Sequence, residues 1–148
     1  INLFQTTIDK FVYLAVLMPI VASMGGVAAT QTLTIVIRGL SLEQIKSSNL
    51  NWLFKRELIV SILNGIFLSI LISIVTYFWF QELLISILIC AAIVINLISS
   101  VIAGIFVPII LNKLNQDPAI AGSVVVTTVT DVIGFFSFLG LATIFLVN

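Results

Sequence analysis

The chain has 148 residues, of which 61% are hydrophobic and only 8% are charged, and its mean hydropathy is +1.31. A soluble domain of this length would be roughly one quarter charged, so the composition indicates an integral membrane protein. Six acidic and six basic side chains cancel, which argues against a nucleic-acid partner. Histidine is absent, which removes imidazole metal ligands and Ser/His triads, so the composition disfavours an enzyme.

Four apolar segments are each long enough to cross a membrane. A hydrocarbon core about 30 Å thick requires roughly 20 helical residues. The segments lie at about 11–37, 58–80, 83–111 and 119–147. Strands of outer-membrane barrels are shorter and alternate in polarity, so helices are expected. We predict an all-α membrane protein, a polytopic bundle of four transmembrane helices that forms one pore domain over residues 1–148.

The connections between these segments predict an orientation. Lys and Arg occur in the first connection, at 38–57, and in the third, at 112–118, whereas the second holds only Gln81 and Glu82. Short basic loops stay in the cytoplasm, so both chain ends are expected on the outer side of the membrane. The protein is then a multi-pass protein of the plasma membrane. Glu43 and Glu57 belong to the first connection and are interpreted as solvated charges at helix ends; the alternative is that they add weaker ion contacts.

Prolines and small residues give expectations for individual segments. Pro19, followed by Gly25 and Gly26, predicts a kink or break in the first segment, and Pro108 is expected to end the third. Small and polar residues recur at spacings of three and four, which predicts close packing of the helices. These stripes are Ser23, Gly26, Thr30 and Thr34 in the first segment, Ser61, Gly65, Ser69 and Ser73 in the second, and Ala92, Asn96, Ser99, Ser100 and Ala103 in the third.

Asp131 is the only charge in the apolar run at 119–147. If the helix starts near Ala119, this residue lies roughly 18 Å along the axis, close to the membrane midplane. A carboxylate at that depth costs about 2.5 to 3.5 kcal/mol, so it usually faces a partner or a water-filled path. Thr127, Thr128 and Gly134 lie on neighbouring turns. Asp131 is therefore a candidate ion site; the alternative is an acid held by hydrogen bonds between helices.

A single aspartate cannot enclose a dehydrated divalent ion. Two copies of Asp131 from a symmetric dimer could face each other across a water-filled pore. Hydrated Mg²⁺ suits this geometry, because it holds its waters tightly and is usually bound through one or two carboxylates. Such a pair of acids would bind the ion partly through its water molecules, between helices embedded in membrane lipid.

Ordered short matches extend along nearly the whole chain. In the last segment they are Asp117-Pro118-Ala119, Thr127-Thr128, Asp131, Gly134 and Gly140-Leu141-Ala142. Before them come PIVASMGGVAATQ at 19–31, Arg38-Gly39-Leu40, Arg56-Glu57-Leu58, Asn64-Gly65, Asn96, Gly104 and Pro108. This ordered set resembles the MgtE-type magnesium channels. The resemblance implies a homodimer whose pore follows the dimer axis, lined by the first and fourth segments.

The resemblance also implies roles for individual residues. Asp131 matches the acid of the pore ion site, and Thr127 matches a position whose backbone carbonyl faces that site. Asp117 matches an acid at the cytosolic mouth, where the regulatory part of the family binds ions and closes the pore. The candidate pore-lining residues are Thr128, Gly134, Gly26 and Thr30. A first membrane helix and cytosolic regulatory domains would precede Ile1 and act as further partners.

Two departures from the family pattern bear on the pore. Val27 and Ala29 stand where the family usually has Asn and Gly, which affects the hydration expected of the pore. The preference among Mg²⁺, Mn²⁺, Co²⁺ and Ca²⁺ stays open. Two other functions also stay open: a proton- or sodium-coupled transporter in which Asp131 titrates, and a non-conducting membrane dimerisation module.

Overall fold

The computed structural model describes residues 2–43 and 50–147, and every regular element within them is helical. In chain order these elements are η1 (Asn2–Phe4), α1 (Gln5–Lys10), α2 (Tyr13–Ser41), α3 (Leu50–Phe80), α4 (Leu83–Lys113), α5 (Pro118–Ala142) and η2 (Thr143–Val147). Four helices are long and apolar enough to cross a membrane: α2, α3, α4, and α5 together with η2. The predicted class, a helical membrane bundle with four spans, is confirmed.

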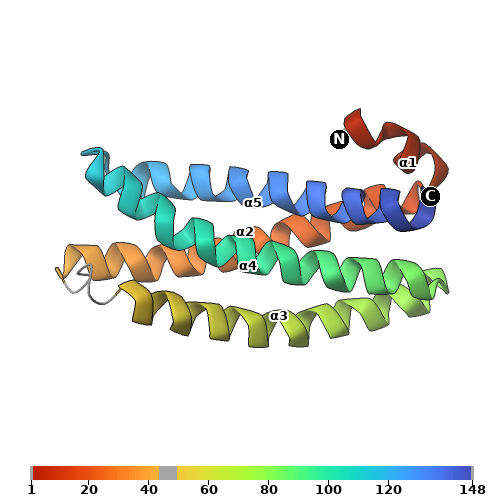
Figure 1. Cartoon of the computed structure of the whole chain (residues 1–148), viewed down its shortest axis with the longest axis horizontal. Helices are drawn as coiled ribbons and strands as arrows, with labels where there is room; N and C mark the ends of the chain where they lie inside the picture. Colours follow the sequence, from red (N-terminus) through yellow and green to blue (C-terminus); the bar gives the residue numbers. More distant parts are fainter. Residues whose placement is uncertain (1, 44–49, 148) are drawn as a thin grey trace.

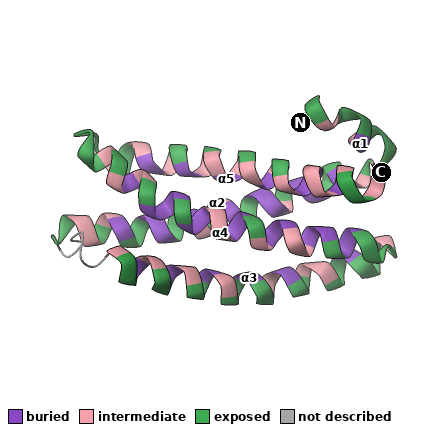
Figure 2. Ribbon diagram, viewed as in Figure 1, coloured by how far each residue is buried: buried purple, intermediate pink, exposed green. Residues whose placement is uncertain are grey.

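Helix α4 lies at the centre of the bundle (Figure 1). It packs against α2, α3 and α5, and α2 also packs against α5. In the most apolar window of α4, 56% of the residues are buried, against 17% in α3. Figure 2 shows the same difference, with buried positions along much of α4 and mostly exposed positions along α3. Helix α3 therefore rests on α4 and leaves a cleft toward α2.

Small side chains bring these helices together, as the stripes in the sequence predict. Ser61, Gly65 and Ser69 are buried along one face of α3. The Ser61 hydroxyl donates to the carbonyl of Leu97 on α4 at 3.3 Å. A Cβ added to Gly65 would lie 3.0 Å from a methyl of Leu97, so this glycine permits the close approach of α3 and α4.

The helix boundaries correct three expectations. Helix α2 is uninterrupted through Pro19, which excludes the break but not the kink expected there, and α4 continues past Pro108 to Lys113. A proline removes a single backbone donor, and neighbouring helices can hold the rest of the helix in place. Helix α3 begins at Leu50, which moves Glu57 from the expected loop into a helix. Residues 44–49 of the first connection lie outside the described residues.

Both described ends of the chain lie at the same end of the bundle as the turn between α3 and α4 (Figure 1). The turn between α4 and α5 lies at the opposite end, together with the end of α2. This arrangement agrees with the alternation of basic loops in the sequence. Three residues after helix ends have left-handed backbone: Glu43 (φ 52°), Gln81 (φ 57°) and Asn115 (φ 56°). Such residues stop a helix and turn the chain back.

Candidate functional site

A groove of about 670 Å³ follows the contact between α2 and α5. Its lining residues are Pro19, Ala22, Ser23, Gly26, Val27, Thr30, Gln31, Thr34, Thr127, Asp131 and Phe135. The structure thus brings Gly26 and Thr30 from the first predicted segment together with Thr127 and Asp131 from the fourth. We call this surface the α2–α5 groove.

Asp131 is the only acidic residue of the α2–α5 groove, and it is half-buried. Within residues 2–43 and 50–147, no hydrogen bond or ion pair to its carboxylate is found, so the interhelical hydrogen bonds of the alternative interpretation are not seen. A carboxylate inside an apolar span that lacks a protein partner requires water or a cation. The charge of Asp131 is therefore available to a ligand in the groove.

Hydroxyl groups on α2 form the opposite wall of the groove. The Thr30 hydroxyl donates to the carbonyl of Gly26 at 2.8 Å, and the Thr34 hydroxyl donates to that of Thr30 at 2.8 Å. Each hydroxyl hydrogen is thus engaged within α2, while the oxygen keeps lone pairs that can accept. This wall offers acceptors, which suits a cation surrounded by water molecules.

Thr127 and Thr128 lie one turn before Asp131, on two sides of α5. Thr127 lines the α2–α5 groove, and its carbonyl accepts a hydrogen bond from the Thr130 hydroxyl at 3.0 Å. Thr128 lines a shallower neighbouring cavity with Ser123, Val124, Thr127 and Asp131. Its hydroxyl donates to the carbonyl of Val124 at 2.8 Å. Asp131 is common to both hollows.

Gly134 is buried between helices and does not line the α2–α5 groove of this protomer. A Cβ at this position would lie 2.7 Å from Nδ2 of Asn96 and 3.4 Å from Cα of Ala22. The residue therefore permits α5 to approach α2 and α4 closely, one turn after Asp131. In this protomer Gly134 contributes to the groove only through the close helix packing that it permits.

Asp117 caps the beginning of α5. Its carboxylate accepts a hydrogen bond from the backbone N–H of Ala119 at 2.8 Å, and Pro118 occupies the first helical position. Both are typical of helix N-termini. Asp117 is exposed at the end of the bundle that the basic loops assign to the cytoplasm. It is thus a capping residue at the expected cytosolic mouth.

The two departures from the family pattern lie in different environments. Val27 is 60% exposed and lines the groove, so the apolar residue at this position borders the path expected for the ion. Ala29 is fully buried, and its carbonyl lies against Gly104 of α4. The first departure concerns hydration of the groove, and the second concerns helix packing.

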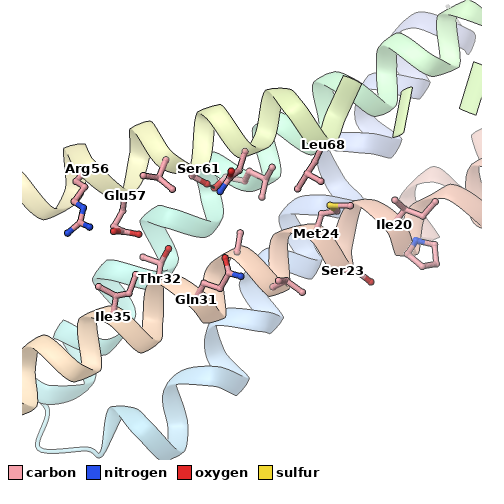
Figure 3. Close-up of a pocket in the computed structure, with 16 residues that line it drawn as sticks. Ile20, Ser23, Met24, Gln31, Thr32, Ile35, Arg56, Glu57, Ser61 and Leu68 are labelled. Carbon is pink, nitrogen blue, oxygen red and sulfur yellow. Dashed lines mark hydrogen bonds between the residues drawn. The ribbon is translucent and has the colours of Figure 1, made fainter. Parts of the chain in front are cut away.

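A larger cavity, of about 840 Å³, lies between α2 and α3 (Figure 3). We call it the α2–α3 cleft. Glu57 lines it and is 9% exposed, which corrects the interpretation of this residue as a solvated charge. The sequence placed Glu57 in a loop because charged residues surround it, and only the extension of α3 back to Leu50 brings it to the cleft. Ser23, Val27 and Gln31 border both hollows.

The chain matches known proteins along nearly its whole length. Residues 18–141 match the MgtE family, described as a divalent cation transporter. The chain is 37% identical over 146 residues to a protein of Bacillus subtilis (strain 168) named "Magnesium transporter MgtE", a match that covers 99% of this chain and 32% of the relative. Proteins of the same name from Enterococcus faecalis and Thermus thermophilus are 26% and 27% identical, and the matches cover 99% and 97% of this chain. The chain spans about a third of the length of these relatives, 32% in each case.

Proposed function

The chain belongs to the MgtE family of divalent cation transporters, and from this premise we propose that it forms the ion-conducting membrane part of a Mg²⁺ transporter. It is a multi-pass membrane protein, and its family is one of transporters of the plasma membrane rather than of enzymes. The similar proteins are named as magnesium transporters. We extend that activity to this chain because the matched part contains the groove with its membrane-embedded acid.

The carboxylate of Asp131, which lines the α2–α5 groove without a partner among the described residues, is the observation that carries the proposal. Asp131 attracts the cation, and the threonine oxygens of the α2 wall accept hydrogen bonds from its water molecules. Mg²⁺ loses its inner waters reluctantly, so a site that binds through water attracts the ion and still releases it. Thr127 lines the same groove one turn away, but its backbone carbonyl already accepts from the Thr130 hydroxyl, so we assign Thr127 to the wall of the site rather than to a free carbonyl ligand.

Two protomers complete the site in this proposal. One carboxylate leaves most of the hydrated ion uncovered, so a single protomer does not complete the site. A second copy related by a twofold axis places another Asp131 opposite the first, with α2 and α5 of both copies around the ion. Closed twofold symmetry is the commonest arrangement of homo-oligomers. The pore then follows the dimer axis.

The similar proteins are longer than this chain, which covers 32% of each of them. We propose that cytosolic regulatory domains act at the mouth marked by Asp117, where an exposed carboxylate at the start of a pore helix can bind an ion. Movement of α5 from that end would reach Asp131 directly, because both residues belong to the same helix.

Ion uptake by Asp131→Asn tests the proposed function. The parent chain and the variant are reconstituted in liposomes, and entry of Mg²⁺ is followed with a trapped fluorescent indicator. We expect the variant to lose most of the uptake while it keeps the dimer in size-exclusion chromatography. Asp9→Asn, at an exposed position on α1, is the matched control and should transport like the parent.

The outcome also separates the other candidate functions. Uptake that acidifies or alkalises the liposome lumen would identify a coupled transporter in which Asp131 exchanges protons. Equal uptake by Asp131→Asn and its parent would contradict a pore site at this residue. A dimer that persists in both proteins without any uptake would identify a dimerisation module.

A further inference from the structure

The α2–α3 cleft contains a second acid, Glu57 on the candidate membrane span α3, that the proposed pore does not use. Glu57 is 9% exposed, which means that more than nine tenths of its surface is covered. Figure 3 shows its carboxylate extending from α3 toward α2, where Thr32 and Gln31 lie opposite. Its oxygens therefore point into the cavity.

Among the described residues, no group is paired with this carboxylate. In the part of the chain that the structure describes, Glu57 has neither a hydrogen bond nor an ion pair. The neighbouring base, Arg56, places its guanidinium 5.5 Å from the ring centroid of Trp52, in a cation–π arrangement on the same helix. An ionised acid in such a covered position is costly unless a cation or hydrogen-bond donors approach it. Arg56 also lines the cleft, but no ion pair joins it to Glu57 among the described residues, so the carboxylate is available to a positively charged ligand.

The remaining polar groups of the cleft define the ligand further. The oxygen-bearing side chains that line it with Glu57 are Ser23, Gln31, Thr32, Ser61 and Asn64. Carboxylate, amide and hydroxyl oxygens are the donors preferred by hard divalent cations, and no cysteine lines the cavity. The hydroxyl hydrogen of Ser61 is engaged by the carbonyl of Leu97, which leaves its oxygen free to accept.

We propose that the α2–α3 cleft holds a second divalent cation, bound by Glu57 and surrounded by water. A cavity of about 840 Å³ has room for the ion with its hydration shell. This site lies within one protomer, between α2 and α3, and it is separate from the Asp131 site on the α2–α5 groove. Because Ser23 and Gln31 border both hollows, an ion at Glu57 lies behind the α2 wall of the proposed pore.

Counting bound Mn²⁺ in the absence of the pore acid tests this site. The Asp131→Asn chain in detergent is titrated with Mn²⁺, and free Mn²⁺ is measured by electron paramagnetic resonance. We expect a saturable site that Mg²⁺ displaces, and at least a tenfold loss of its affinity when Glu57→Gln is added. Glu82→Gln, at an exposed glutamate in the turn between α3 and α4, is the control and should leave the count unchanged. Equal binding with and without Glu57→Gln would overturn the proposal.

A second measurement places the ion and does not require the Glu57 variant to fold. The chain has two methionines, and Met18 is buried in the core away from the cleft. Ile35→Met adds a methyl reporter on the cleft wall close to Glu57 (Figure 3). In the Asp131→Asn background, Mn²⁺ should broaden the ¹³C-methyl signal of position 35 far more than that of Met18. Equal broadening of the two signals would contradict the site. Since both experiments lack the pore acid, their failure leaves the proposed pore function standing, and that function is tested by uptake alone.

Discussion

The side-chain amide of Asn96 donates a hydrogen bond to the backbone carbonyl of Val21 at 2.8 Å and so joins α4 to α2. One turn further along, the Ser100 hydroxyl donates to the carbonyl of Gly25 at 2.8 Å. Asn96 is fully buried, and its Oδ1 is the single buried side-chain polar atom without a partner among the described residues. Gly25 and Gly134 lie against its amide. The relative position of the two groove helices therefore depends on Asn96.

Gly25→Ala is expected to destabilise the protein through this contact. The added Cβ would overlap the amide of Asn96, which has no free space to move because it is fully buried. Overpacking of this kind costs typically about 1 to 3 kcal/mol. The measurement is thermal unfolding in detergent, followed by circular dichroism or by loss of the monodisperse peak.

Two further variants separate overpacking from a general effect of alanine. Gly140→Ala is the matched control, since a Cβ there has no neighbour within 4 Å, and it should be neutral or slightly stabilising. Asn96→Ala should make Gly25→Ala nearly harmless, because residues in contact are coupled in a double-mutant cycle. Additive effects of the two substitutions would show that the contact is not the cause.

The sequence predicts the class of fold better than the details that position the site. The four spans and the stripe with Ser61 and Gly65 follow from hydropathy and from spacings of three and four, which are local properties. Gly134 and Glu57 show where local reasoning stops. The side of α5 that faces α4 depends on how Gly134 fits against Asn96. The burial of Glu57 depends on how α3 packs against α4. Both are tertiary facts without a local signal.

Asp117 allows capping to be separated from ion binding at the mouth of the proposed pore. Its carboxylate accepts from the N–H of Ala119, so Asp117→Ala should cost about 1 kcal/mol of stability. Asp117→Ser keeps a capping oxygen and removes the charge, so its unfolding temperature should match that of the parent. If both variants have a lower unfolding temperature than the parent, the charge of Asp117 rather than its capping hydrogen bond stabilises this end of α5. Mg²⁺ uptake by Asp117→Ser then measures the contribution of the charge alone.

Gln81 offers a site for stabilisation in the turn between α3 and α4. Its φ of 57° is left-handed, a conformation that costs a residue with a Cβ roughly 1 kcal/mol and costs glycine little. The hydrogen bond from its side chain to the carbonyl of Phe78, at 3.1 Å, is exposed and should contribute little. Gln81→Gly should therefore raise the unfolding temperature, and Gln81→Val should lower it. An equal change in both variants would exclude backbone strain as the cause.

Val27 tests whether hydration of the groove limits transport. The residue is 60% exposed and lies on the same face of α2 as Thr30 and Gln31, so a polar amide at this position would add a donor and an acceptor for water along the path. We expect Val27→Asn to increase the initial rate of Mg²⁺ uptake severalfold in liposomes. Val132→Asn is the control: this residue is similarly exposed, at 61%, and does not line the α2–α5 groove. A faster rate in both variants would point to a general effect of polarity on the bundle. A faster rate in Val27→Asn alone, abolished by adding Asp131→Asn, would place the hydrated path along α2 and α5, because the two residues face the same groove from opposite helices.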